Sequence, residues 1–358
     1  MNISLTQEND MIIQKNNSLL SQIIGSNIAS VKRINDGRNS SVYTLTCENS
    51  KKYVVKFYFP NPSDKKDRMN KEFSSLKFLW EHSIRSIPQP IAIEKEHQFA
   101  IYDHIEGTKI LFQEINAKDI DYACEFLKKL YRLKTREESN QLPFASEACF
   151  SVREIVENIE ERYKRLTALP REDKQNNALF EFLEKEFNPS LSTTVTWCKD
   201  ELTKQGIYYS SKLEKENRTL SPSDFGFHNA IRQKDGSIVF LDFEHFGWDD
   251  PAKMISDFLI HPDMDPQPNL KKLFVRNMVS YFVEDKNLKT RLKVVFPLFG
   301  LKWCLIFLNE FLPEDFQRRE FAHNKELVKE KVQAQQLLKA KNFLNQVMKN
   351  FKNFPYGA

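Results

Sequence analysis

The sequence predicts an α+β protein of two lobes, in which an N-terminal antiparallel five-stranded sheet with one main helix precedes a mostly helical C-terminal lobe. Three observations predict this class. The chain has 358 residues, about twice the length of a typical domain. Runs rich in β-branched and aromatic residues are concentrated in about the first hundred residues, and helical periodicity prevails afterwards. We expect one lobe over residues 1–106 and the other over 107–358.

The N-terminal lobe is predicted from strand-like runs that alternate with turn clusters. A short amphipathic helix is expected at 9–24, and a longer one at 64–82, where Ser63 or Asp64 could be the N-cap. The resulting order is βββαββ and ends near Gly107. The strands are expected at 28–34, 42–47, 53–59, 91–94 and 99–103.

The C-terminal lobe is predicted from apolar residues at helical spacing. A loop-rich segment at 218–251 interrupts the helices and contains one short strand, 238–241. The helices are expected at 116–134, 152–167, 173–187, 189–204, 251–260, 269–284, 288–312 and 323–352.

Composition excludes several classes of protein. Lys and Arg total 53 against 49 Asp and Glu, and this net charge of +4 is too small to predict binding to nucleic acid or to a membrane surface. The most apolar stretch, Val294–Leu308, is shorter than the about 20 residues of a membrane span. The five cysteines form no CxxC pair, which argues against zinc and disulfide frameworks. No signal peptide is evident, so we expect a cytoplasmic protein.

The nine glycines exclude the common nucleotide-binding fingerprints. No pair of them can form GxGxxG or GxxxxGK, so a dinucleotide fold and a P-loop are both absent from the sequence. The sequence also has no GxSxG nucleophile elbow and no HExxH zinc motif.

The segment that indicates chemistry contains two aspartates and an asparagine. Asp224 is followed five residues later by Asn229, and Asp242 follows the short strand expected at 238–241. Phosphoryl transfer needs such a set, in which one carboxylate accepts the proton of the attacking hydroxyl while an amide oxygen and a second carboxylate hold Mg²⁺. Alone, the segment could equally consist of turn and strand-end residues.

A lysine and a glutamate upstream favour the catalytic interpretation. Lys56 lies in the middle of an expected strand between apolar neighbours, where an unpaired lysine is costly. Glu72 lies on the expected helix 64–82 and could pair with it. A strand lysine, a helix glutamate, the Asp224–Asn229 spacing and a strand-end aspartate occur here in the order of a kinase-like fold.

The tripeptide Asp224-Phe225-Gly226 has the same letters as the metal-binding DFG of protein kinases. We do not assign it that role, because it precedes both the asparagine and the strand and therefore occupies the base position. Asp242-Phe243-Glu244 occupies the metal position, with Glu244 as a possible helper.

These motifs resemble those of the aminoglycoside phosphotransferase/choline kinase family, the small-molecule branch of the protein-kinase-like fold. The resemblance covers about residues 28 to 320 and includes a nucleotide loop at 35–43. It also includes an interlobe hinge at 99–107, where the backbone of Asp103 and Ile105 would bind adenine, and a GDP…D-like stretch at 247–257. A protein kinase fits less well, since no APE motif or activation segment follows Asp242.

The sequence departs from the family pattern in three places. Pro222 stands where the family usually has a histidine two residues before the base. His228 lies four residues after the base instead of two, and it could contact substrate or cap the loop. The nucleotide loop is poor in glycine, so the hydroxyls of Ser40 and Ser41 and the backbone N–H groups would contact the phosphates.

The resemblance implies an ATP- or GTP-dependent and Mg²⁺-dependent phosphotransferase acting on a hydroxyl of a small molecule. The acceptor could be a sugar, a nucleotide-linked sugar, an amino alcohol or an aminoglycoside-like compound, bound in part by Trp303, Asn309 or Glu310. The alternative is a kinase-like pseudoenzyme that acts as a nucleotide-binding scaffold or sensor. No nucleic acid or membrane partner is expected, and the oligomeric state stays open. The implied roles are Asp224 as catalytic base, Asn229 and Asp242 as metal ligands, and Lys56, Glu72, Ser40, Ser41, Asp103 and Ile105 as nucleotide-binding residues.

Overall fold

The computed structural model describes residues 5–36, 40–58, 67–171, 173, 176–323 and 328–357. The chain forms two compact units. The sheet unit comprises residues 1–108, 231–245 and 316–327, and the helical unit comprises the remainder. Each unit is described by itself below. The predicted boundary after residue 106 stays a prediction.

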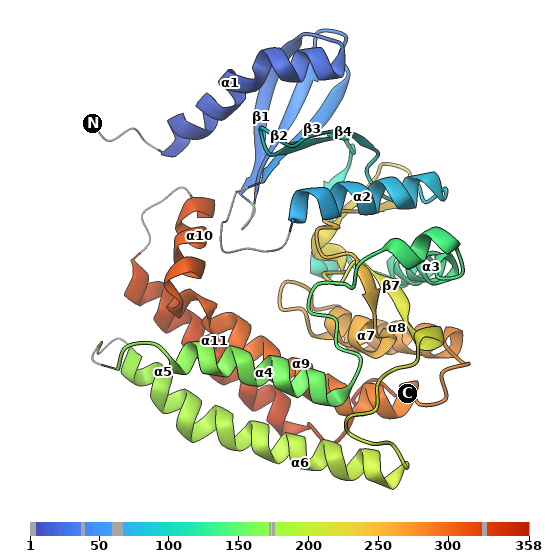
Figure 1. Cartoon of the computed structure of the whole chain (residues 1–358), viewed down its shortest axis with the longest axis vertical. Helices are drawn as coiled ribbons and strands as arrows, with labels where there is room; N and C mark the ends of the chain where they lie inside the picture. The colour runs from blue at the N-terminus through green and yellow to red at the C-terminus, as the bar shows by residue number, and fades with distance from the viewer. Residues whose placement is uncertain are drawn as a thin grey trace. The chain divides into compact units, whose positions relative to one another are not determined.

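A five-stranded antiparallel sheet in the order β1-β2-β3-β5-β4 forms the centre of the sheet unit (Figure 1). This confirms the predicted sheet and its βββαββ order. Helix α2 begins at Arg68 with Asp67 as N-cap, whereas Ser63 and Asp64 lie outside the described residues. The elements are α1 (Leu5–Ile24), β1 (Ile28–Asp36), β2 (Ser40–Cys47), β3 (Lys52–Tyr58), α2 (Arg68–Glu81), β4 (Pro90–Glu94) and β5 (Phe99–Asp103).

The two faces of this sheet pack against different helices because side chains alternate along each strand. On one face Tyr43, Val55 and Ile101 form a core with Ile13 and Leu20 of α1. Lys56 and Tyr58 of β3 and Tyr102 of β5 point to the opposite face. Strands β3 and β5 are neighbours in the sheet. Helix α2 packs against β4 and β5, and its Phe73 contacts Tyr102. The alternation therefore turns Lys56 toward the helix that carries Glu72.

Strand β9 (Ile238–Phe240) also belongs to the sheet unit and positions Asp242. It lies in a small sheet of order β6-β8-β9 with β6 (Thr108–Lys109) and β8 (Ala230–Arg232). The N–H of Phe240 donates to the carbonyl oxygen of Ser86 at 2.9 Å. Strand β9 ends at Phe240, two residues before Asp242 and one residue earlier than predicted.

The helical unit is built around α9, which packs against α4, α6, α7 and α11 (Figure 1). Among the described residues one stretch, Leu288–Phe311, has the length and apolar composition of a membrane span. It consists of α9 and the following turn, and 67% of its apolar window is buried inside the protein, as expected of a core helix. The α-helices are α3 (Ala117–Leu133), α4 (Val152–Thr167), α5 (Asn177–Phe182), α6 (Asn188–Lys204), α7 (Pro251–Ile260), α8 (Pro268–Tyr281), α9 (Leu288–Phe307) and α11 (Lys329–Lys349).

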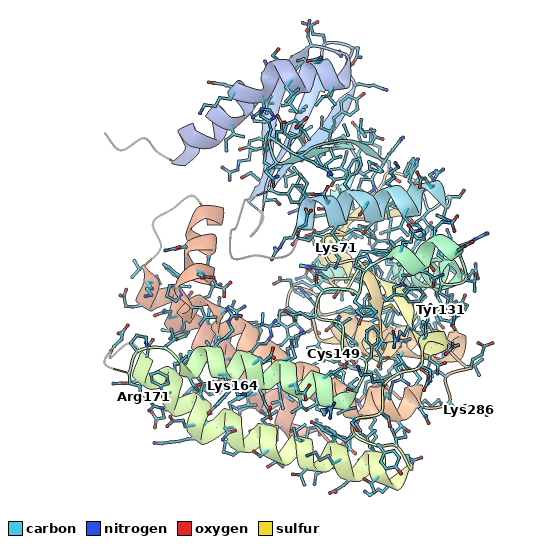
Figure 2. All side chains as sticks on the ribbon, viewed as in Figure 1. Lys71, Tyr131, Cys149, Lys164, Arg171 and Lys286 are labelled. Carbon is cyan, nitrogen blue, oxygen red and sulfur yellow. The ribbon has the colours of Figure 1, made fainter. Side chains whose placement is uncertain are left out.

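The side chains of this unit follow the usual division between interior and surface (Figure 2). Cys149 is buried, whereas the side chain of Arg171 is 63% exposed. All five cysteines are buried and free.

Several boundaries differ from the prediction. The helix expected at 323–352 corresponds to α11, which begins at Lys329. A helix that was not predicted, α10 (Pro313–His323), precedes it, and residues 324–327 lie outside the described residues. The helix expected at 173–187 begins at Asn177 and continues as a π-helical turn from Leu183 into α6. Besides β9, the loop-rich segment contains three short strands that were not predicted. They are β8, in the small sheet with β9, and β7 (Thr219–Ser221) and β10 (Gly247–Asp249), which pair with each other. Strands of three residues are too short to show a period in sequence.

Candidate active site

Lys56 of β3 lies among three carboxylates in the sheet unit. Its Nζ lies 2.7 Å from Oε2 of Glu72, 3.2 Å from Oδ1 of Asp242 and 3.7 Å from Oε2 of Glu244. Burial opposes the charged form of this lysine, but the carboxylates of Asp242, Glu72 and Glu244 outweigh it and raise its pKa well above the ordinary value. The structure therefore brings together Lys56, Glu72 and Asp242, and the lysine stays charged.

Glu72 is buried and uses both carboxylate oxygens for internal contacts. Oε2 accepts hydrogen bonds from Lys56 and, at 2.5 Å, from the hydroxyl of Tyr58, while Oε1 accepts the N–H of Phe243 at 3.3 Å. The hydroxyl of Tyr58 also lies 2.9 Å from that of Tyr102. Burial raises the pKa of Glu72, against the opposing effect of Lys56. Burial, reinforced by Glu72, raises the pKa of Tyr58, which therefore remains a hydrogen-bond donor.

Sequence analysis did not find Tyr58 or Tyr102. A signal was present for Tyr58, since it follows Lys56 by two residues and so lies on the same face of β3. Tyr102 had no such signal because its contact depends on the pairing of β3 with β5.

Asp242 and Glu244 differ in accessibility, although only one residue separates them. The side chain of Asp242 is 37% exposed, whereas that of Glu244 is 5% exposed. Glu244 accepts a hydrogen bond from Nη1 of Arg68 at 3.1 Å and lies 3.3 Å from Nε2 of His245. Ligand atoms of Glu72, Asp242 and Glu244 lie within 4.8 Å of one another, and the role of Glu244 as a helper at the metal stays a prediction.

Asp242 has a left-handed backbone conformation, with φ of 63°. Residues other than glycine rarely adopt it, and such conformations concentrate at functional sites. Ser223, immediately before Asp224, has the same property with φ of 69°. The left-handed backbone positions are thus Asp242 itself and the residue immediately before Asp224.

Asp224 and Asn229 lie together in the helical unit. Nδ2 of Asn229 donates to the carbonyl oxygen of Asp224 at 3.1 Å and lies 3.3 Å from Oδ2 of the same residue. Two histidines face the other carboxylate oxygen: Nε2 of His228 lies 3.1 Å and Nε2 of His261 lies 3.4 Å from Oδ1. Burial, with a further contribution from His228, lowers the pKa of His261 to about 4, so its ring is neutral at physiological pH.

A buried lysine supports the loop that carries Asp224. Nζ of Lys253 lies 2.8 Å from Asp249, 2.9 Å from Asp257 and 3.0 Å from the hydroxyl of Ser223. Burial opposes the charge on Lys253, but Asp249 and Asp257 raise its pKa. Burial raises the pKa of Asp249 to about 6, against the effect of Lys253. Lys253 thereby anchors Ser223. This residue follows Pro222, which stands where the family usually has a histidine.

The remaining predicted residues lie at the ends of strands in the sheet unit. Ser40 and Ser41 begin β2, and both are buried. The loop before them, 37–39, lies outside the described residues. Asp103 ends β5, and its N–H donates to the carbonyl oxygen of Gln89 at 2.9 Å. Ile105 follows in a segment without regular structure.

The donor atoms suit Mg²⁺, which prefers hard oxygen ligands. The amide nitrogen of Asn229 is directed at Asp224, so its oxygen is the atom left for a metal. Oδ1 of Asp242 accepts a hydrogen bond from Lys56, and Oδ2 is the oxygen that we expect to bind the metal. Asn229 and Asp242 belong to different units, so their joint action stays a prediction.

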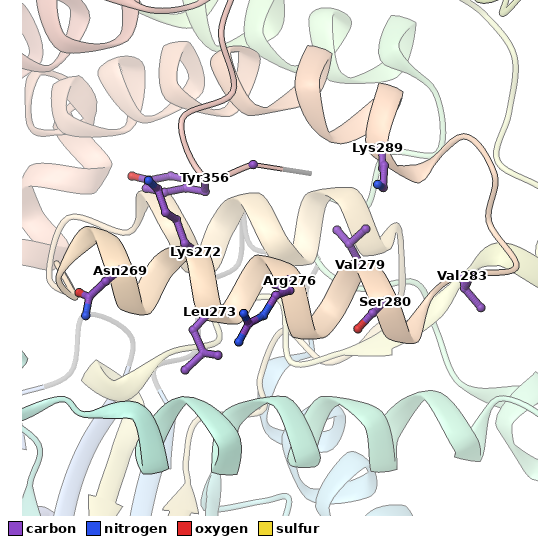
Figure 3. Close-up of a pocket in the computed structure, with 10 residues that line it drawn as sticks. Asn269, Lys272, Leu273, Arg276, Val279, Ser280, Val283, Lys289 and Tyr356 are labelled. Carbon is purple, nitrogen blue, oxygen red and sulfur yellow. The ribbon is translucent and has the colours of Figure 1, made fainter.

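A surface pocket of about 530 Å³ in the helical unit is separate from these residues (Figure 3). It is lined by residues of α8, by Lys289 of α9 and by Tyr356, and shares none with the sets around Lys56 and Asp224. Its lining includes three basic side chains, Lys272, Arg276 and Lys289.

Solved structures show the class of protein to which this fold belongs. A spectinomycin phosphotransferase in its AMP-bound complex matches with a TM-score of 0.61 at 16% identity, over 90% of this chain and 98% of that chain. Choline kinase LicA from Streptococcus pneumoniae matches with a TM-score of 0.54 at 14% identity, over 95% and 99% of the two chains. An ethanolamine kinase from Plasmodium vivax matches with a TM-score of 0.55 at 14% identity, over 89% and 83%. The fold is therefore the kinase-like fold of small-molecule kinases, which confirms the predicted fold class.

The family is shown by the sequence itself. The model of the phosphotransferase enzyme family matches residues 30–272, more than half of the chain. The chain belongs to this family, which confirms the resemblance drawn from its motifs, and it is a small-molecule phosphotransferase. No curated protein sequence matches the chain significantly.

Proposed function

We propose that the protein transfers the γ-phosphoryl group of ATP to a hydroxyl of a small molecule in a Mg²⁺-dependent reaction. The observation that carries this proposal is the buried cluster in which Lys56 contacts Glu72 and Asp242. A scaffold protein gains little from burying the charges of Lys56 and Glu72, since buried charges cost free energy. A phosphotransferase needs a charged lysine held rigidly for the nucleotide phosphates.

In this proposal Lys56 contacts the α- and β-phosphates and Glu72 holds its ammonium group in place. Tyr58 and the N–H of Phe243 occupy the remaining acceptor positions of Glu72, so the glutamate is fixed from three sides. The backbone of Asp103 and Ile105 would bind adenine, and the hydroxyl of Ser40, which pairs with Tyr58 on the Lys56 face of the sheet, would lie toward the phosphates. Ser41 pairs with Phe57 on the opposite face, so it would contribute through its backbone N–H.

Asp224 is proposed as the general base. An oxygen of the acceptor hydroxyl bonds to the γ-phosphorus as the bond from that phosphorus to the bridging oxygen of ADP breaks, and the hydroxyl proton passes to Asp224. Two histidines face Oδ1 and the amide nitrogen of Asn229 faces Oδ2, so these contacts hold the carboxylate in one orientation. The side chain of Asp224 is 36% exposed, which leaves it accessible.

Asn229 and Asp242 would hold Mg²⁺ through their side-chain oxygens. The ion, when bound, neutralises charge on the phosphates. The two side chains contribute one amide and one carboxylate oxygen, a set that leaves the other coordination positions to phosphate and water.

The acceptor we propose is a hydroxyl compound of low charge, such as a sugar or an amino alcohol. A polycationic aminoglycoside needs many accessible carboxylates. Asp249 and Asp250 are buried and paired with Lys253 and Arg291, and Glu310 is buried as well. Trp303 is close to the proposed base, because its ring meets that of His261 edge to face at 4.9 Å.

Phosphotransfer to a panel of acceptors tests this proposal. The purified protein is incubated with MgATP or MgGTP and choline, ethanolamine, simple sugars or aminoglycosides, and ADP or GDP release and the phosphorylated product are both measured. Asp224→Asn should lower kcat by about 10²–10⁴-fold and change the KM for MgATP no more than a few fold. Asp200→Asn, at an exposed position of α6, is the control. Transfer at the parental rate by Asp224→Asn would exclude Asp224 as the base.

A further inference from the structure

Two imidazole rings converge on one oxygen of Asp224. Nε2 of His228 and Nε2 of His261 lie 3.1 and 3.4 Å from Oδ1. All of these residues belong to the helical unit. Nδ2 of Asn229 lies 3.3 Å from Oδ2. The two oxygens of this carboxylate therefore have different surroundings.

The hydrogen-bond partners of the rings determine where their hydrogens lie. The N–H of Asp263 donates to Nδ1 of His261 at 3.3 Å, so that nitrogen carries a lone pair and the hydrogen of the neutral ring is on Nε2. Nδ1 of His228 is buried without a hydrogen-bond partner among the described residues. A hydrogen there would be an unsatisfied buried donor, so the neutral ring of His228 also carries its hydrogen on Nε2. Both rings then donate to Oδ1.

Packing holds the two rings in this arrangement. Their centroids are 3.8 Å apart and their planes differ by 4°, so they are stacked. Trp303 packs edge to face against His261. A Cβ at Gly226 would lie 2.8 Å from Nδ1 of His228, so the glycine of the sequence Asp224-Phe225-Gly226 makes room for this ring. The glycine of this tripeptide is thus explained by the packing of His228 and not by a metal-binding DFG motif.

The same three side chains could be considered as a metal centre, since their ligand atoms lie within 4.8 Å of one another. A metal ion bound by an imidazole lies near the plane of the ring, along the nitrogen lone pair. No point lies in the planes of two parallel rings stacked 3.8 Å apart. The observed arrangement therefore suits two donors to one oxygen better than two ligands to one ion.

We propose that His228 and His261 are positioning residues that clamp Oδ1 of Asp224 and thereby fix the orientation of its carboxylate for the acceptor hydroxyl. The inference rests on the proposed role of Asp224 as base. Two charge-assisted hydrogen bonds restrict rotation of the carboxylate, and loss of one such bond typically changes a rate about 10- to 100-fold. Neither histidine exchanges a proton with the acceptor.

Paired substitutions at His228 separate the hydrogen bond from ring packing. His228→Phe keeps a stacking ring and lacks the donor, and His228→Gln keeps an N–H near the position of Nε2 and lacks the ring. We expect His228→Phe to lower kcat about 10- to 100-fold with an unchanged Kd for MgATP, and His228→Gln to recover most of the loss. A merely structural role of the ring predicts the opposite order. His97→Gln, at a surface histidine of the sheet unit, is the control.

Nitrogen-15 NMR of the histidine rings in the unmodified protein tests the clamp without any acceptor. Both His228 and His261 should show the Nε2–H tautomer, and Asp224→Ala should shift both sets of ring signals while leaving those of His97 unchanged. Parental kcat in His228→Phe, or unshifted signals in Asp224→Ala, would overturn the clamp. Absence of phosphotransfer by the parent protein would contradict the proposed function, and the NMR result would still decide whether the clamp exists.

Discussion

At the scale of single residues, buried lysines organise both halves of the candidate active site. Lys56 joins β3 to α2 and to the segment after β9, and Lys253 joins α7 to the loop before Asp224. Each lysine is surrounded by carboxylates from more than one segment, so each compensates for the burial of charges that would otherwise be costly. The same contacts that position the site therefore also stabilise the unit that contains it.

We predict that Lys56→Ala weakens MgATP binding and also lowers stability. The substitution leaves Glu72 and Glu244 buried with one cation fewer, and breaking a buried ion pair typically costs about 3–5 kcal/mol. Calorimetry of MgATP binding and a denaturant titration measure the two effects. Lys52→Ala on the same strand is the control, since Lys52 pairs with the exposed Glu106. Unchanged affinity in Lys56→Ala would show that the lysine is not a phosphate contact.

Asp242 and Glu244 should respond differently to substitution. We expect Asp242→Ala to abolish the Mg²⁺ dependence of nucleotide binding, because the exposed carboxylate is lost. Glu244→Gln should retain that dependence and lower the melting temperature, because Arg68 and Lys56 lose a charged partner. Calorimetry with ADP in the presence and absence of Mg²⁺ distinguishes them. The reverse pattern would assign the metal to Glu244.

At the scale of elements, the long helices and strands were predictable because their apolar residues repeat over several turns or pairs. A helix that was not predicted, α10, begins at Pro313, before the helix expected at 323–352. Proline is favoured in the first turn of a helix, so Pro313 was a sequence signal for this start. Short strands such as β7 and β10 depend on each other for hydrogen bonds and have no such signal.

The packing of α9 on α11 gives a prediction at this scale. A Cβ at Gly300 would lie 2.6 Å from Cγ2 of Val347, so Gly300→Ala should overpack the contact and destabilise the protein by about 1–3 kcal/mol, reduced by the better helix propensity of alanine. In a Val347→Ala background the clash is removed, and the same substitution should stabilise by up to about 1 kcal/mol. Denaturant titration of the four variants measures the coupling. Equal effects in both backgrounds would show that a Cβ at position 300 does not contact the side chain of Val347.

At the scale of the whole molecule, the sheet unit recruits residues 231–245 from the middle of the sequence. This segment brings Asp242 to Lys56, although 186 residues separate them. A linear division of the sequence into two lobes cannot represent such an exchange. It follows from tertiary contacts, including the pairing of Phe240 with Ser86 and the hydrogen bond from Phe243 to Glu72.

Global stability should fall as the pH decreases from about 7 to about 4, in part because of His261. The pKa of His261 is about 4 in the folded protein and about 6.5 in the unfolded protein. Its contribution to the free energy of unfolding is therefore present in full above pH 6.5 and is lost as the pH falls from 6.5 through 4. The difference between these two pKa values corresponds to on the order of 3 kcal/mol of unfolding free energy. The charged and titratable groups that shift its pKa are His228, Asp224, Asp263 and Asp257. Asp249, with a raised pKa of about 6, acts in the opposite direction.

Denaturant titrations of the parent, His261→Gln and His97→Gln at several pH values measure this contribution. The slope of unfolding free energy against pH should decrease in His261→Gln and stay parental in His97→Gln, whose side chain is 47% exposed. An unchanged slope in His261→Gln would show that this ring does not remain neutral in the folded protein.

The sequence by itself determined the fold class, the family and the pairing of Lys56 with Glu72. These follow from local periodicity and from the order of a few residue types, both of which are properties of the chain as written. Only the tertiary structure decided what surrounds those residues: the burial of Glu244 beside Arg68, the support of Ser223 by Lys253, and the two histidines at Asp224. Except for the contact of His228 with Asp224, four residues away, each of these contacts joins segments that are distant in sequence. Their side chains meet only because whole elements pack together, and single residue types at such separations leave no pattern to detect.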